Sequence, residues 1–230
     1  MNTTNQPDNN LPQRSYWTLG MALGASLLLG ACSMSSTPNY YTLASGGGAI
    51  PSNALRMIEV LPVGLPDRLD RMQIVLQDAA GKSQLLDQQR WTSTLSSELR
   101  DGLSAGLQQR LGAADRYRSG STTTLPVYRI ATDFSHFDVV KDQSGVNINV
   151  AVTWTINRTE NISGTTATVQ AKRQLACRMS FNTLANSPAA SEIDAMVSAS
   201  RQSLDRISGA IAASVFMLEG GVKSADAVCS

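Results

Sequence analysis

The chain has 230 residues, of which 42% are hydrophobic and 16% charged, and 19 Lys and Arg side chains nearly balance 18 Asp and Glu. A net charge of +1, without a cluster of basic residues, argues against a nucleic-acid-binding protein, because such proteins concentrate positive charge on one surface. The length suits one ordinary domain with a substantial hydrophobic core.

The N-terminal region ends in a lipoprotein processing motif. The apolar run from Trp17 to Gly30 is too short for a comfortable membrane span, which needs about 20 residues, and has the length of a signal-peptide core. It closes with Leu29-Gly30-Ala31-Cys32, the lipobox pattern in which cleavage falls before the cysteine. Residues 1–31 are therefore predicted to be a signal peptide, although Arg14 is the only basic side chain ahead of the apolar run.

Cys32 is predicted to carry the membrane attachment. A diacylglycerol on its thiol and an N-acyl chain such as palmitate supply more than one lipid chain, which is enough for stable anchoring. Ser33 predicts the outer membrane, because the sorting rule for these lipoproteins retains Asp at that position in the inner membrane. We expect no cofactor beyond these covalent lipids. Residues 32–54 would comprise the anchor, a polar tether and a short strand at Asn39–Leu43.

Residues 55–220 are predicted to form the main domain, and its first part reads as strands. Leu55–Val63 has apolar residues on both faces, which is typical of a central strand. A charged turn, Leu65–Arg71, follows it. Two short apolar runs, Met72–Gln77 and Lys82–Leu86, are separated by a glycine-ended turn and predict a hairpin.

A first helix is predicted from leucines at every fourth position. It would begin at Trp91, run to Leu111 and end at Gly112. Gly102 and Gly106 inside it would each cost about 1 kcal/mol relative to alanine. Their expected use is close approach to a neighbouring element.

Three strands of an antiparallel meander are predicted next. In Leu125–Val140 the buried residues change parity, and an extra residue near Ser135 or His136, a β-bulge, would return them to one face. Val146–Asn157 alternates large apolar residues with asparagine, threonine and alanine, so its opposite face is small and uncharged. The third strand would cover about Thr166–Phe181.

A second helix is predicted after the meander. Ser187-Pro188 would supply its cap and first position, and Gly220-Gly221 would stop it. Its apolar stripe consists of Ile193, Val197, Leu204, Ile207, Ile211, Val215 and Leu218. The prediction for the domain is an α+β fold, an antiparallel β-sheet with two long helices packed on one face.

Cys177 and Cys229 remain once Cys32 is acylated. An even number of cysteines in an oxidising compartment favours a disulfide, and two unpaired thiols are the alternative. The loop closed by this bond would stabilise the fold by about 4 kcal/mol in the chain-entropy description. Cys229 lies in a C-terminal tail, residues 221–230.

No group of residues predicts catalysis. His136 is the only histidine, which nearly excludes a Cys/His metal site and a histidine-based triad. Asp67, Arg68, Asp70 and Arg71 carry opposite charges in one turn, which is more typical of a solvated salt-bridge set than of an acid–base pair. No glycine-rich loop has the lysine and following helix of a phosphate-binding site. We therefore expect an anchored protein that is neither an enzyme nor a metal-binding protein.

Several stretches together resemble one protein family. They are Tyr40-Tyr41-Thr42-Leu43 close behind the lipobox, the specific stretch Leu65-Pro66-Asp67-Arg68-Leu69-Asp70-Arg71-Met72-Gln73-Ile74-Val75, Trp91 opening a leucine-rich helix, and Phe134 and Phe137-Asp138 before a strand with Trp154. Over nearly all of the mature chain, this combination resembles the PqiC (YmbA) family of ABC-type transport auxiliary lipoproteins. Residues 186–190 and the tail with Cys229 depart from the family pattern, so the resemblance does not bear on the disulfide.

The resemblance implies a non-catalytic accessory subunit of an MCE-type intermembrane lipid transport system that supports envelope integrity. Such a lipoprotein works with an inner-membrane transporter and docks a periplasm-bridging MCE-domain protein, as one copy or as a ring of copies. Candidate contacts are the uncharged face of Val146–Asn157, exposed edge strands between copies, and the turn residues Leu65, Pro66, Asp67, Arg68, Asp70 and Arg71.

Three other interpretations stay open at this level. The charged turn could only cap the sheet, in which case its residues are structural. The protein could be a structural assembly lipoprotein of another envelope complex. It could also be a small-lipid-binding lipoprotein, which would need a deep apolar pocket.

Overall fold

The computed structural model describes residues 1–3, 37–44, 54, 56–118, 120, 123–143, 145–159, 172–185, 191–221 and 226–230. Cys32, Ser33 and nearly all of the predicted signal peptide lie outside these residues. The chain divides into two units, Met1–Thr37 and Pro38–Ser230, and the second contains the folded domain. Among the described residues, no helix is both long and apolar enough to span a membrane.

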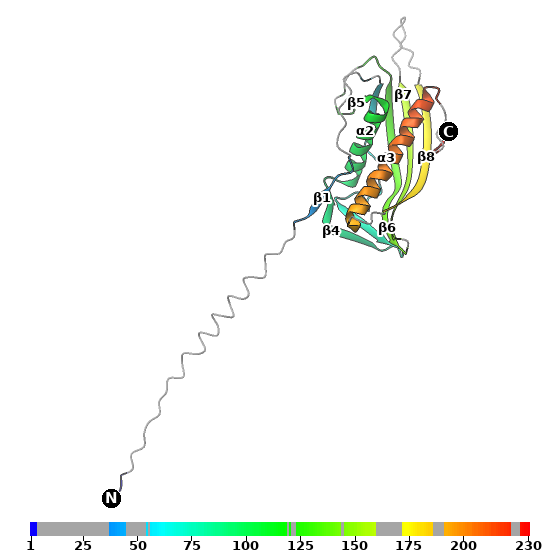
Figure 1. Cartoon of the computed structure of the whole chain (residues 1–230). Helices are drawn as coiled ribbons and strands as arrows, with labels where there is room; N and C mark the ends of the chain where they lie inside the picture. The colour runs from blue at the N-terminus through cyan, green and yellow to red at the C-terminus, as the bar shows by residue number, and fades with distance from the viewer. Residues whose placement is uncertain are drawn as a thin grey trace. The chain divides into compact units, whose positions relative to one another are not determined.

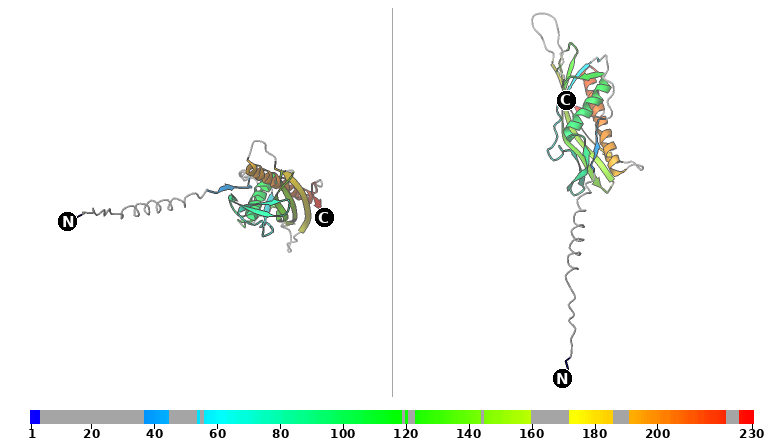
Figure 2. Two further views of the ribbon diagram at one scale, coloured as in Figure 1. Left: turned by 90° about the horizontal axis from the view of Figure 1, so that it is seen from below. Right: turned by 90° about the vertical axis from the view of Figure 1, so that its left-hand side faces the viewer.

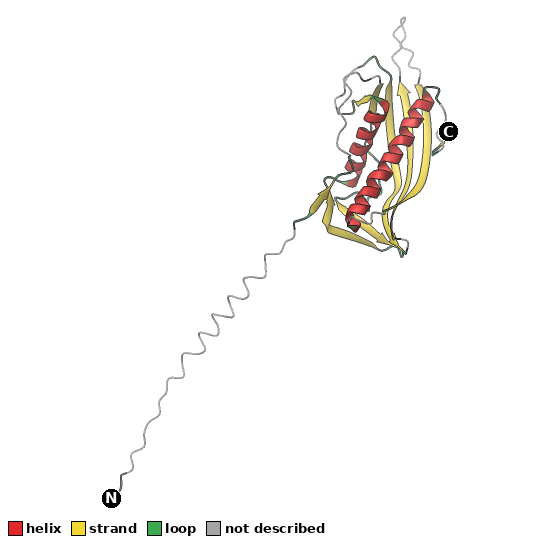
Figure 3. Cartoon of the chain, viewed as in Figure 1, coloured by secondary structure: helices red, strands yellow, loops and turns green. Residues whose placement is uncertain are grey.

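One sheet and two helices make up the described part of the domain (Figures 1 and 3). The helices are α2 (Leu95–Leu111) and α3 (Glu192–Leu218). They lie side by side on one face of the sheet (Figures 1 and 2), so the predicted α+β layer arrangement is confirmed. The strands are β1 (Asn39–Tyr41), β2 (Arg56–Val60), β3 (Gln73–Asp78), β4 (Ser83–Trp91), β5 (Ala113–Asp115), β6 (Val127–Asp142), β7 (Gly145–Thr159), β8 (Lys172–Leu184) and β9 (Val228–Cys229).

The strands β6, β7 and β8 form the predicted antiparallel meander at the centre of the sheet. The register between β6 and β7 shifts between Phe134 and His136, where the sequence predicted a bulge. The bulge returns Phe137 to the face of Phe134, and the two rings meet edge to face with their centroids 5.8 Å apart. The third strand is described from Lys172 and ends later than predicted, at Leu184; its predicted first residues, 166–171, lie outside the described residues.

The sheet is mixed, where the sequence predicted antiparallel pairing throughout. The segment from β2 through β3 runs in one direction along a single edge of β6, so β2 and β3 both pair parallel with β6. The short strand β1 is also parallel to β4. The hairpin of β3 and β4 and the meander are antiparallel, as predicted. The sheet order is β1-β4-β3-β6-β7-β8-β9, with β2 paired to β5 and β6.

The first helix starts four residues later than the leucine spacing predicted. Trp91 is the last residue of β4 and packs its side chain in the core from there. Gly112 ends α2 in the left-handed conformation, with φ of 57°, as predicted. Gly102 and Gly106 face α3, and a Cβ at Gly106 would lie only 3.0 Å from the Ser208 Cβ. The expected close approach of a neighbour at these glycines is therefore confirmed.

The second helix begins at Glu192, and the prediction that Ser187-Pro188 opens it is wrong. The cap is Ser191, whose hydroxyl accepts a hydrogen bond from the Asp194 amide at 3.1 Å. Ser187 and Pro188 lie outside the described residues. The predicted apolar stripe of α3 packs in the core, with Ile193 and Leu218 at its two ends only partly buried.

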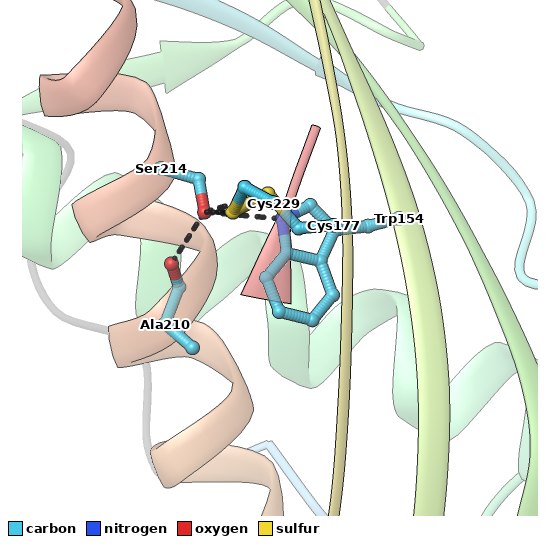
Figure 4. Close-up of a disulfide and its surroundings, with 5 residues drawn as sticks. All are labelled: Trp154, Cys177, Ala210, Ser214 and Cys229. Atoms are coloured by element: carbon cyan, nitrogen blue, oxygen red, sulfur yellow. Dashed lines mark hydrogen bonds between the residues drawn. A yellow bond between two sulfur atoms is a disulfide. The ribbon is translucent and has the colours of Figure 1, made fainter. Parts of the chain in front are cut away.

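The C-terminal tail adds a strand to the sheet, which the sequence did not predict. Cys229 of β9 lies opposite Cys177 of β8, and the two form a disulfide. The bond packs beside the buried Ser214 hydroxyl of α3, which accepts from the Trp154 Nε1 at 3.2 Å and donates to the Ala210 carbonyl at 2.9 Å (Figure 4). The tail is thus attached to the edge of β8 and to the core beneath α3.

Candidate docking surface

The Leu65–Arg71 turn lies beside the bulge of β6, between the stretches of β6 that pair with β2 and with β3. Gly64 pairs with β6, since its amide donates to the Thr132 carbonyl at 3.0 Å and its carbonyl accepts from the Phe134 amide at 2.9 Å. The turn closes with the Leu69 amide donating to the Pro66 carbonyl at 2.8 Å, and the Leu69 side chain is buried in the core. The turn therefore connects β2, which pairs with one stretch of β6, to β3, which pairs with the next stretch along the same edge of β6.

Arg68 connects this turn to β6. Its Nη2 donates to the Asp138 Oδ1 at 2.9 Å, and the Asp138 Oδ2 is hydrogen-bonded with the His136 Nδ1 at 2.8 Å. The Asp138 side chain is 6% exposed and that of Arg68 is 50% exposed. A buried carboxylate thus holds two partners, and half of the Arg68 side chain stays at the surface.

The second half of the turn caps α2. The Asp70 Oδ1 accepts from the Ser96 amide at 3.1 Å, and the Arg71 carbonyl accepts from the Leu95 amide at 3.3 Å. Asp67, like Arg68 and Asp70, is exposed. These contacts give Arg68 and Asp70 structural roles. For these two residues, they favour the alternative in which the turn caps the sheet and its residues are structural.

The second candidate surface is the face of the sheet turned away from the helices. On β7 the buried residues alternate with the predicted small polar set, and Thr153 at its middle is exposed. The strand registers extend this face on both sides. It consists of Arg129, Ala131, Asp133, His136, Asp138 and Val140 of β6, Asn147, Asn149, Ala151, Thr153, Thr155 and Asn157 of β7, and Gln174, Ala176, Arg178, Ser180, Asn182 and Leu184 of β8.

The structure brings the two candidate surfaces together. Asp138, which binds Arg68, lies opposite Asn149 in the register, and His136 lies opposite Ala151. The turn and the sheet face are therefore one continuous surface, which we call the outer surface. Sequence reasoning placed His136 in the bulge but did not identify it as the residue at this junction.

The outer surface is close to electrically balanced. Arg129 and Arg178 are offset in part by Asp133, and the Arg68–Asp138 ion pair is neutral as a unit. Most remaining members are asparagine, threonine, serine or alanine. A partner would therefore recognise this surface through hydrogen bonds and shape, with little long-range attraction.

A hollow of about 400 Å³ lies on the outer surface where β9 meets β8. Its rim includes Thr153, Thr155, Arg178 and Val228. The groove between α2 and α3 offers only about 50 Å³, although ligand pockets commonly hold at least 300 Å³. The wider concavity thus lies on the sheet side of the domain.

Two acidic side chains that accept several hydrogen bonds were not identified from the sequence. Hydrogen bonds with Arg56, at 2.8 and 2.7 Å, hold the pKa of Glu219 below its usual range, and Glu219 also accepts from the Tyr128 hydroxyl. Burial, together with this bond to Glu219, raises the pKa of Tyr128 well above its ordinary value. This cluster attaches the end of α3 to β2 and β6. The other acidic side chain is Glu98 of α2, which binds the N-terminal residues of the domain.

No cluster of three or more His, Cys, Asp or Glu side chains that could hold a metal ion occurs in the described part of the chain. Several described side chains that carry charge form ion pairs between elements. Examples join Arg100 to Asp115 at 2.7 Å and Arg110 to Asp205 at 2.6 Å. This arrangement suits a binding surface on a rigid domain.

Comparisons with known proteins found a family model and solved structures that this chain resembles. The family model described as "ABC-type transport auxiliary lipoprotein component" matches residues 41–212. A crystal structure of an uncharacterized protein is 20% identical, with a TM-score of 0.51, and the match covers 78% of this chain and 99% of that one. A Xanthomonas campestris protein is 12% identical, with a TM-score of 0.44, over 80% of this chain and 96% of its own. No curated protein matches.

Proposed function

Because the chain belongs to the family of ABC-type transport auxiliary lipoprotein components, we propose that it serves an MCE-type intermembrane lipid transport system. In this role it is a non-catalytic subunit that docks the MCE-domain protein. The MCE-domain protein bridges the periplasm, and its transporter lies in the inner membrane at the other end. The subunit thereby supports the integrity of the envelope.

The observation that carries the proposal is the continuity of the outer surface. A broad, electrically balanced sheet face with a hollow on it and a turn fixed to its edge can accept a folded protein surface. Both helices pack on the opposite face, so the outer surface is accessible while the core stays closed.

The membrane attachment is part of the proposal. Cys32 carries the diacylglycerol and an N-acyl chain, and Ser33 directs the protein to the periplasmic face of the outer membrane. No other cofactor is proposed. Copies of the subunit pair into a ring through exposed edges, because β1 covers only Gln89–Trp91 of β4 and leaves the rest of that edge without a partner among the described strands.

A mild-detergent pull-down of the tagged, acylated protein, with mass spectrometry of the proteins recovered, tests the docking role. Charge reversal at Arg68 would also disturb Asp138, so a better variant is Thr153→Arg, which places a bulky charge on the exposed middle of the outer surface. Ser198→Arg, on the exposed side of α3, is the matched control.

The proposal predicts that an MCE-domain protein is recovered with the wild type and with Ser198→Arg and is lost with Thr153→Arg. A preparation without any MCE-domain protein, even after crosslinking in cells, would contradict it and favour a structural assembly lipoprotein. Lipid recovered at one molecule per chain without a protein partner would favour a lipid-binding lipoprotein.

A further inference from the structure

Glu98 is a buried carboxylate that the docking role does not use. It lies in the first turn of α2 and is 4% exposed. One oxygen, Oε2, accepts from the Thr42 hydroxyl at 2.9 Å and from the Leu43 amide at 2.8 Å. The other, Oε1, accepts from the Ser93 amide at 3.1 Å, from the Ser93 hydroxyl at 3.0 Å and from the Thr92 hydroxyl.

These bonds attach the N-terminal segment of the domain, Asn39–Leu43, which we call the strap. Two further bonds hold it, because the Thr92 amide donates to the Tyr41 carbonyl and the Arg201 Nε of α3 donates to the Thr42 carbonyl, each at 2.8 Å. Leu43 is 2% exposed and packs in the core. The strap is therefore fixed to β4, α2 and α3 together.

The charge of Glu98 is well suited to this contact. Hydrogen bonds to a carboxylate are shorter and stronger than those between neutral groups. Burial raises the pKa of Glu98, but the bonds from Thr92, Leu43, Thr42 and Ser93 outweigh it and hold the pKa below its usual value. The carboxylate is thus ionised across the neutral pH range, and two of its five donors belong to the strap.

The strap begins only a short distance in sequence after the predicted lipid anchor. Pro38 is six positions after Cys32, so even a fully extended chain spans at most about 20 Å between them. If the strap were released as far as Ala44, the same geometry would allow roughly 40 Å. Docking of the strap therefore halves the reach between the acyl chains and the folded domain.

We propose that Glu98 is a positioning residue for the lipid anchor, and that the strap end of the domain contacts the headgroup region of the bilayer. The side chain suited to this contact is Tyr40, which is 54% exposed and lies two residues after Pro38, beside Arg90 in the register. Tyrosine and arginine both tolerate the boundary between water and lipid. The inference rests on the lipid anchor of the proposed function.

The test uses the full-length acylated protein in vesicles of phosphatidylethanolamine and phosphatidylglycerol that carry an acceptor dye on a fraction of the headgroups. A donor dye is placed on one introduced cysteine, either Gln88→Cys beside the strap or Gln174→Cys near the start of β8; both sites are exposed. Cys177 and Cys229 are joined in the disulfide and Cys32 is acylated, so the introduced thiol is the reactive one.

Leu43→Asp releases the strap by placing a second carboxylate at the buried position next to Glu98, and Thr42→Ser keeps the hydroxyl and is the matched control. Hydrogen exchange reports release directly. We expect the backbone amide at position 43 to exchange at least tenfold faster in Leu43→Asp than in the wild type, with the strands β6–β8 unchanged. This pattern separates release of the strap from unfolding of the domain.

We expect energy transfer to the bilayer to be stronger from position 88 than from position 174 in the wild type and in Thr42→Ser, and the difference to disappear in Leu43→Asp. Equal transfer from the two sites in the wild type would overturn the inference. So would a difference that persists once exchange shows the strap to be released. Failure of the acylated protein to bind vesicles at all would overturn the lipid anchor itself.

Discussion

The same substitution, glycine to alanine, should have opposite effects on stability in α2 and in α3. At Gly106 of α2, an added Cβ would lie 2.8 Å from the Ser208 Oγ and 3.0 Å from the Ser208 Cβ. At Gly209 of α3, the nearest atom would be the Arg110 Nε at 3.8 Å, an ordinary contact distance. The two positions therefore separate helix propensity from packing between the helices.

Alanine is the better helix former by about 1 kcal/mol at either position. At Gly209 that gain is realised, and it raises the melting temperature by about 2–4 °C in a chain of this size. At Gly106 overpacking costs about 1–3 kcal/mol, because Ser208 is buried and its hydroxyl is already bonded to the Leu204 carbonyl at 2.9 Å. The net effect there is a loss of about 1 kcal/mol.

Thermal and urea unfolding of the two variants and the wild type, followed by circular dichroism, measure this contrast. The expected order of stability is Gly209→Ala, wild type, Gly106→Ala. Equal stabilisation by both substitutions would refute close contact between the helices at Gly106. A loss at Gly209 as large as that at Gly106 would refute the assignment of its open environment.

Three further predictions concern stability. Replacing Cys177 and Cys229 together by alanine should lower the free energy of unfolding in urea by about 4 kcal/mol, and an unchanged midpoint would contradict a disulfide in the purified protein. The pKa of Glu98 is lowered in the folded state, so the contribution of its carboxylate to stability is complete when the pH is above the ordinary pKa of 4.5. This contribution is lost as the pH falls below that value, so Glu98→Gln should make the free energy of unfolding depend less steeply on pH in the acid range. Asp70→Ala should cost about 1 kcal/mol by uncapping α2, whereas Asp67→Ala should cost less than about 0.5 kcal/mol; similar losses would show that capping is not the cause.

Local sequence patterns were enough to predict the elements whose structure is determined by their own residues. The alternation in β7 and the parity change in β6 are properties of single strands, so the bulge beside His136 could be located without knowing the fold. Ser187-Pro188 has the residue types of a helix start, but α3 begins after Ser191 instead. The acidic Asp194 three residues after Ser191 is the capping pattern that would have identified the true start.

Other features depend on contacts between distant residues and leave no local signal. Trp91 fits the leucine spacing of α2 but ends β4, because its amide bonds to the Met72 carbonyl of the neighbouring chain segment at 2.7 Å. The turn and the small polar face were predicted as separate surfaces, and only the Arg68–Asp138 bond across the fold joins them. Glu98 looks like an ordinary exposed acid of a helix start until the strap covers it.

Photo-crosslinking in living cells is the most direct test of the docking role. A photoreactive amino acid at Thr153, on the outer surface, is compared with the same residue at Ser198, on the exposed side of α3. We expect Thr153 to yield a crosslinked product with an MCE-domain protein and Ser198 to yield none. Crosslinking to that protein from Ser198 alone, or from neither site while the protein is correctly acylated and folded, would contradict docking through the outer surface.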